Sequence, residues 1–127
     1  MRADVGAATL LLLGAVATGM MLVLVVADVG GYIAGGIQAA TAADAAALAA
    51  APVTFLSYGT TNTPRREAAR FAEVNGASLV SCRCAVDRSW RSRTVEVVVE
   101  RSLNLILFGP RMVRAVGRAE FVPTMLH

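Results

Sequence analysis

The sequence predicts an α+β fold in which a long N-terminal transmembrane helix extends into a small exported domain with a short helix and a three-stranded antiparallel sheet. Three observations lead to this prediction: an uncharged apolar run over residues 5–27, an alanine-rich continuation to residue 51, and three later stretches in which apolar and polar residues alternate. We expect the helical part to cover residues 1–51 and the exported domain to cover residues 52–127.

The apolar run over residues 5–27 contains 23 residues, of which six are Leu and five are Val. As a helix it extends about 35 Å, enough to cross a hydrocarbon core about 30 Å thick. Its Leu and Val side chains favour membrane insertion by about 4 to 5 kcal/mol. Two alternatives fit less well, because a cleaved signal peptide has a shorter apolar region and a small soluble core cannot enclose such a helix. We expect the run to span a bilayer.

The charge distribution predicts the orientation of this span. The chain carries a net charge of +3, and the first basic residue after the run is Arg65, whereas Arg2 precedes the run. Arg and Lys close to a span favour the cytoplasmic side. We therefore expect a single-pass protein of the cytoplasmic membrane with its N-terminus inside and residues 28–127 outside.

The segment that follows the run continues the helix with smaller side chains. No proline occurs until Pro52, and Ala, the best helix former, dominates. Gly31 and Gly35 form a G-x-x-x-G step of the kind that lets two helices approach closely. Four Gly within residues 30–36 also weaken the helix by about 1 kcal/mol each. A helix-packing face and a flexible joint outside the membrane are equal alternatives here.

Asp44 shares an apolar stripe of this helix with Ile33, Ile37 and Leu48. A carboxylate on an apolar stripe is either solvated, because the stripe is loosely buried, or paired with an Arg of the domain or of a neighbouring subunit. The second interpretation assigns Asp44 to helix packing, together with Gly31 and Gly35.

A short helix is predicted after a turn-rich loop over residues 57–63. Pro64 begins this helix, Thr63 caps it, and Gly76 follows its end near Asn75. Ala68, Phe71 and Ala72 form its apolar face, while Glu67 and Arg70 have a favourable i,i+3 spacing.

Three strands are predicted over residues 77–86, 93–101 and 113–122. The apolar residues expected on one face are Val80, Cys82, Cys84 and Val86 in the first, Val95, Val97 and Val99 in the second, and Val113, Ala115, Ala119 and Phe121 in the third. The apolar segment LNLILF over residues 103–108 is predicted as a short helical turn. We expect it to cover the far side of the sheet, rest on the membrane or contact a partner.

Cys82 and Cys84 are the two cysteines of the chain. In an extended strand their Cα atoms lie about 6.5 to 7 Å apart, at the outer limit of disulfide geometry. We therefore expect no bond between them. They are either small core residues or candidates for an intermolecular disulfide in an oxidising compartment.

The sequence gives little support for catalysis or nucleic-acid binding. Arg residues surround Trp90 in a pattern found in nucleic-acid-binding proteins, but hairpin connections are commonly charged and solvated, so we expect no nucleic-acid partner. There is no Gly-rich phosphate loop, His–carboxylate pair, nucleophile elbow or H-E-x-x-H motif. We expect no enzymatic activity, cofactor, metal or small-molecule substrate. The Arg residues around Trp90 are Arg83, Arg88, Arg91 and Arg93.

Three segments together resemble a known family. The long helix ends in AADAAALAAA over residues 42–51, residues 66–82 read REAARFAEVNGASLVSC, and the chain closes with RAVGRAEFVP over residues 114–123. This order resembles the small TadE/TadG-like pilus-assembly proteins, especially an actinobacterial type. The resemblance implies a minor pilin-like membrane component of a Tad (Flp) type IV pilus or type II-like secretion system.

The same resemblance implies Gly6 as a candidate processing site. Many pilin-like members carry a Glu five residues further on, where this chain has Leu11. Members of this type often also have a Cys before the middle helix, which is absent here, whereas Cys84 is present.

Together these features predict a non-enzymatic structural or assembly component of a pilus-like apparatus. Its expected partners are the membrane and other pilin-like or pilus-assembly membrane proteins, with incorporation into an extracellular pilus as a further step. The alternative is a free-standing, membrane-anchored binding or sensor module outside the cytoplasm. Co-purification with pilin-like proteins distinguishes the first function from the second.

Overall fold

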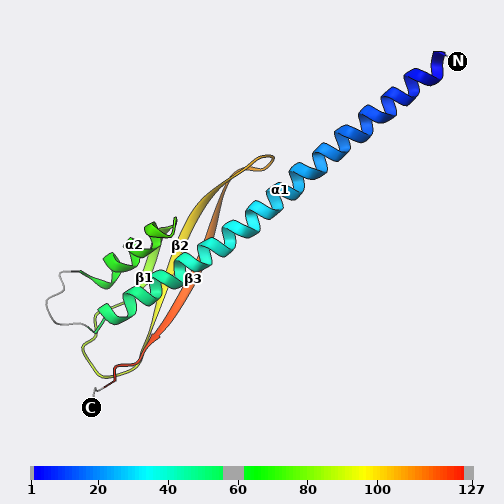
Figure 1. Cartoon of the computed structure of the whole chain (residues 1–127). Helices are drawn as coiled ribbons and strands as arrows, with labels where there is room; N and C mark the ends of the chain where they lie inside the picture. The colour runs from blue at the N-terminus through cyan, green and yellow to red at the C-terminus, as the bar shows by residue number, and fades with distance from the viewer. Residues whose placement is uncertain (1, 56–61, 125–127) are drawn as a thin grey trace.

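The computed structural model describes residues 2–55 and 62–124 and confirms the predicted α+β fold. A long helix is followed by a short helix and a three-stranded antiparallel sheet with strand order β1-β2-β3 (Figure 1). The elements are α1 (Arg2–Val53), α2 (Pro64–Val74), β1 (Ser78–Arg83), β2 (Arg93–Leu105) and β3 (Gly109–Phe121).

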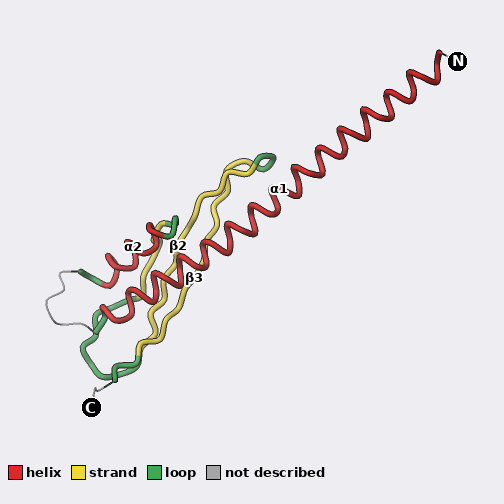
Figure 2. Tube along the Cα trace, viewed as in Figure 1, coloured by secondary structure: helices red, strands yellow, loops and turns green. Residues whose placement is uncertain are grey.

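Helix α1 is one unbroken helix of 52 residues. The sheet and α2 lie beside its C-terminal half, and its N-terminal half projects beyond them (Figures 1 and 2). The helix passes without interruption through the four Gly of residues 30–36, and it ends just after Pro52. The predicted continuation of the apolar run into a second helical segment is therefore confirmed.

The core lies between α1, α2 and one face of the sheet. Ala side chains of α1 meet Val side chains of β2, and Val95, Val97 and Val99 are buried as predicted. Small residues let the helix lie close to the sheet, as at Gly117 of β3. A Cβ atom built at Gly117 overlaps the carbonyl group of Ala43. The α1 residues in this core are Ala42, Ala43, Ala46, Ala47, Ala50 and Ala51.

The opposite face of the sheet carries charges. Glu96 and Arg118 are direct cross-strand partners, with 2.8 Å between Oε2 and Nε, and Glu100 and Arg114 lie 3.4 Å apart in the same way. The Arg118 guanidinium lowers the pKa of the Glu96 carboxyl through this hydrogen bond. The core is therefore on the other face of the sheet, which the helices cover.

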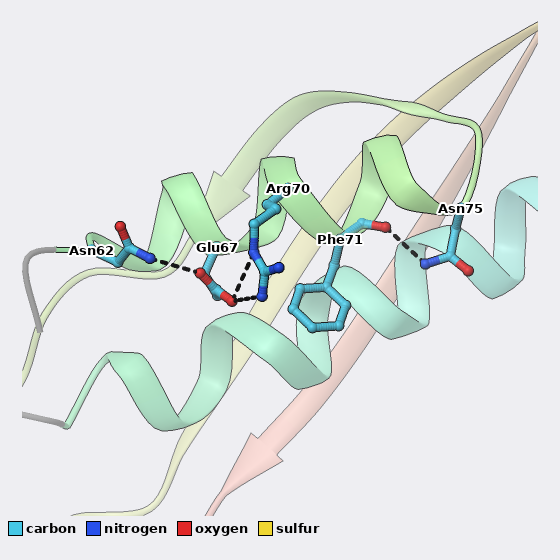
Figure 3. A network of polar contacts seen from close by, with 5 residues as sticks. All are labelled: Asn62, Glu67, Arg70, Phe71 and Asn75. Carbon is cyan, nitrogen blue, oxygen red and sulfur yellow. Dashed lines mark hydrogen bonds and ion pairs between the residues drawn. The ribbon is translucent and has the colours of Figure 1, made fainter.

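Helix α2 has the predicted start and N-cap, and it ends at Val74, one residue before the predicted end. The Thr63 hydroxyl accepts a hydrogen bond from the Arg66 amide at 3.2 Å, and Pro64 occupies the first helical position. Glu67 and Arg70 form the predicted ion pair at 2.6 Å (Figure 3). Phe71 points from α2 toward α1, where it packs against the core (Figure 3). The loop predicted before α2 lies largely outside the described residues.

Two details of the first strand differ from the prediction. A bulge between Leu79 and Ser81 shifts the register of β1 on β2, so that Leu79 packs against the core with Cys82. The strand ends at Arg83, and Val86 is exposed. In β3 the predicted face packs on the core, since Ala119 is buried and Ala115 and Phe121 pack against the core residues. Gly117, which was not predicted on this face, is also buried there.

The prediction of a helical turn over residues 103–108 is wrong. Leu103 and Leu105 continue the alternation of β2 and face α1, so β2 runs four residues further than predicted. The three residues 106–108 form the turn of the β2–β3 hairpin, and Gly109 follows with a positive φ of 69°. The apolar side chains of this segment therefore occupy both a strand and a hairpin tip.

Candidate functional site

The N-terminal part of α1 exposes its apolar side chains. Every residue from Asp4 to Val23 is exposed, and Leu11 retains 77% of its accessible surface. Within the described residues, α1 is the one helix long and apolar enough to cross a membrane. Gly6 lies in this exposed part, with no other side chain near it. Nothing in the described fold covers this stretch of helix.

Gly31 and Gly35 lie beneath β2 of the same chain. A Cβ atom at Gly35 overlaps the Leu103 side chain, and a Cβ atom at Gly31 comes within 3.6 Å of Leu105 Cδ2. The small-residue face thus accommodates leucines of the sheet. A Cβ atom built at Gly30 or Gly36 meets open space, with nothing within 4 Å of it.

Asp28 joins α1 to the tip of the β2–β3 hairpin. Its side chain is buried, with 2% of its surface accessible. The carboxylate accepts hydrogen bonds from the amides of Ile106 and Leu107, both at 2.7 Å, and from that of Phe108 at 3.3 Å. Three successive turn amides therefore converge on one carboxylate, as in backbone nests that bind anions. We call this contact the Asp28 latch.

The latch holds Asp28 in its charged form. Burial by itself raises the pKa of the Asp28 carboxyl, but the three amide donors outweigh burial and lower the pKa below its ordinary value of 3.8. The buried charge is thus matched by backbone dipoles, with no cation among its three hydrogen-bond partners. At neutral pH the carboxylate fixes the hairpin to α1 immediately after the apolar run.

The hairpin tip is apolar and largely exposed. Ile106 retains 68% of its accessible surface, and Phe108 retains 53%. A hollow of about 380 Å³ lies between the tip and α1. Its lining residues are Asp28, Val29, Tyr32, Leu105, Phe108 and Arg111. The tip, the latch and this hollow together form what we call the tip site.

Asp44 lies on the outer face of α1. It is exposed, as are Ile33, Ile37 and Leu48. The stripe predicted from their spacing exists and faces away from the sheet, so Asp44 is solvated within this chain. The stripe continues the exposed surface of the apolar run along the part of α1 that carries the domain.

Cys82 and Cys84 form a disulfide with each other, and the prediction that they do not bond is wrong. The Cα atoms lie 5.3 Å apart, closer than in an extended strand, because β1 ends at Arg83 and the chain bends before Cys84. Neither sulfur is free, so neither is available for an intermolecular disulfide while this bond is intact.

Arg93 has a structural role in the connection between β1 and β2. Its guanidinium donates to the carbonyls of Asp87 and Ser89, and it lies 5.8 Å from the Phe55 ring and 5.7 Å from the Phe121 ring. Trp90 packs edge-on against Phe55 at 5.0 Å. Arg88 and Arg91 are exposed, and Arg83 lines a second hollow of about 620 Å³ beside the disulfide. This polar end of the domain is opposite the tip site along β2 and β3.

Within the described residues, no group of three or more His, Cys, Asp or Glu side chains lies close enough to hold a metal ion. No family model, no curated protein and no solved structure matches the chain.

Sequence reasoning missed the Asp28 latch and the close approach at Gly117. Asp28 is separated from the turn it binds by 78 to 80 residues, so no local pattern connects them. One signal was present: Asp28 is the first charged residue after the uncharged run. A second was Gly117 among the alternating residues of β3, because an isolated Gly in a strand often marks close backbone approach.

Proposed function

We propose that this protein is a non-enzymatic, membrane-anchored structural or assembly component of a pilus-like apparatus. The resemblance of its sequence to TadE/TadG-like proteins makes a minor pilin-like role in a Tad (Flp) type IV pilus or type II-like secretion system the specific form of the proposal. The observation that carries it is one unbroken helix that exposes large apolar side chains over residues 5–23 and buries Ala in its own domain further on.

The arrangement suits lateral packing among other hydrophobic helices. The apolar run needs a nonpolar environment, because it exposes Leu and Val on all sides. The outer stripe with Ile37 and Leu48 extends this surface into the exported part. Because the helix is continuous from the membrane into the domain, the position of its membrane part also determines the position of the sheet. These properties fit a subunit that neighbours contact along its length.

The orientation in the proposal places the domain outside the cytoplasm. Arg2 precedes the run, and the next basic residue is Arg65. The bond between Cys82 and Cys84 supports the same orientation, because disulfides persist in oxidising compartments and are rare in the cytosol. The chain is then a single-pass protein of the cytoplasmic membrane, retained there or incorporated into the filament.

Site-specific photo-crosslinking in producing cells tests the proposal. A photoreactive residue at Ile37, or at Leu48 in a second variant, is expected to form crosslinks with a second copy or with other proteins that have an N-terminal apolar helix. The matched control is a photoreactive residue at Leu103, which faces α1 inside the same chain. It is expected to yield intramolecular crosslinks.

Identification of the captured proteins by mass spectrometry decides the outcome. Pilin-like partners at Ile37 and at Leu48 support an assembly component. Absence of intermolecular crosslinks at both positions, together with monomeric behaviour in detergent, contradicts it and favours the free-standing binding or sensor module.

A further inference from the structure

The tip site lies at the level where α1 leaves its uncharged stretch. Asp28 directly follows residue 27, and its carboxylate holds the turn amides of residues 106–108 within 2.7 to 3.3 Å. The hairpin tip is the part of the folded domain that reaches furthest toward the projecting half of α1 (Figure 1). If α1 spans a bilayer over residues 5–27, the tip lies at the membrane surface.

The depth of the lipid headgroup layer matches this position. Each headgroup region adds about 5 to 8 Å to the hydrocarbon core, and five helical residues rise about 7.5 Å. The segment from Asp28 to Tyr32 therefore crosses this layer. The tip, bonded to Asp28, lies beside the same segment.

The chemistry of the tip fits the same layer. Ile106 and Phe108 are more than half exposed, and Tyr32 retains 52% of its surface. Apolar and aromatic side chains gather where headgroups meet acyl chains. Arg111 lines the hollow beside Phe108 and is exposed, so its guanidinium is available to a lipid phosphate. The turn amides, which water or lipid would otherwise have to satisfy, are already bound by Asp28.

We propose that the β2–β3 hairpin tip is a second membrane contact, which inserts Ile106 and Phe108 into the lipid headgroup region beside α1 while Arg111 contacts lipid phosphate. This inference rests on the proposed function in one respect, the insertion of α1. The contact fixes the angle between the domain and the bilayer, because the domain is then held at two points. The partner of the tip is the bilayer in which α1 is embedded.

Tryptophan quenching by brominated lipids tests this contact in the full chain. The purified protein is placed in nanodiscs of phosphatidylcholine brominated near the headgroup end of the acyl chain. Phe108→Trp in a Trp90→Phe background reports on the tip, and Leu12→Trp in the same background reports on α1. Native Trp90, at the opposite end of the sheet, is the aqueous control. Ile106→Trp is the second tip reporter and replaces Phe108→Trp if that variant does not fold.

The expected result is quenching and blue-shifted emission for the tip reporter, as strong as for Leu12→Trp, with native Trp90 unchanged. Quenching of Leu12→Trp without quenching of either tip reporter overturns the inference and leaves the span intact. Absence of quenching at both the tip and Leu12 overturns the inference together with the membrane span. Quenching of native Trp90 to the same extent as the tip also contradicts a contact specific to the hairpin.

Discussion

The two halves of α1 are both apolar, but their side chains differ in size and in surroundings. The stretch up to Val23 exposes Leu, Val and Met, whereas the stretch from Ala39 to Ala51 buries Ala against the sheet and α2. Large apolar side chains keep the backbone of a packing partner further from the helix, whereas Ala lets a partner backbone come close. In this chain side-chain size, more than hydrophobicity, separates the part of the helix that folds with the domain from the part that projects.

The largest effect on stability is expected where α1 lies close to β3 at Gly117. Gly117→Ala places a methyl group on the carbonyl of Ala43, and a rigid backbone cannot move aside as a flexible side chain can. We expect a loss of about 3 kcal/mol in the free energy of unfolding. Urea unfolding in mild detergent, followed by Trp90 fluorescence, measures it. Gly36→Ala is the matched control, because its Cβ meets open space, and it is expected to leave stability unchanged or raise it by about 1 kcal/mol. Equal stability of the Gly117→Ala and Gly36→Ala variants contradicts the close approach.

The same substitution in each half gives a direct comparison. Ala46→Leu adds volume to a fully buried position and is expected to cost about 2 kcal/mol of unfolding free energy. Ala17→Leu adds the same volume to an exposed position and should leave domain stability unchanged. It should improve membrane insertion by about 0.5 kcal/mol. The unfolding measurement used for Gly117→Ala checks both variants. A comparable loss in both would show that the two halves have similar surroundings.

The disulfide is expected to have a smaller effect. It closes a loop of three residues, so the chain-entropy estimate of its stabilisation is about 1.5 kcal/mol. The Cys82→Ser/Cys84→Ser double variant should lose about this amount and keep the fold. Complete unfolding of the variant would indicate that the bond, and not the Ala–Val core, maintains the domain.

The Asp28 latch predicts a local pH dependence. The pKa of Asp28 is lowered in the folded protein, so its contribution to stability is present above its unfolded pKa near 3.8 and is lost as the pH falls through the lower folded value. The NMR shifts of the amides of residues 106–108 should change in this acidic range. In Asp28→Asn they should not titrate, while the Ser89 amide, bonded to Asp87, should still do so. Titration of residues 106–108 that persists in Asp28→Asn contradicts the latch.

Much of the fold could be predicted from the sequence, because local patterns determine it. The uncharged run and the Ala-rich segment predicted α1, and the valines at 95, 97 and 99 predicted the buried face of β2. The end of β2 was missed because the alternation of Leu103 and Leu105 merges with the apolar turn that follows. The disulfide was missed because the rule for an extended strand was applied to Cys84, which lies beyond the strand end.

The tip site is less accessible to sequence reasoning than the fold. The local sequence contains the apolar segment LNLILF, and membrane contact is one of three expectations that this segment supports. Its attachment to Asp28 depends on the path of the whole sheet along α1, which brings together residues 78 to 80 positions apart. The proximity of the tip to the end of the apolar run is therefore visible only in the folded structure.

We propose that the surroundings of α1 change from lipid to water and domain near Asp28. Single cysteines at Leu12 and Ile37, introduced into the purified chain in lipid nanodiscs, test it by reaction with a water-soluble maleimide. The unsubstituted chain, whose two cysteines are joined, gives the background. We predict that Ile37→Cys reacts rapidly and Leu12→Cys reacts only after the lipid is removed. Equal reaction rates at the two positions in intact nanodiscs would show that the surroundings of α1 do not change near Asp28.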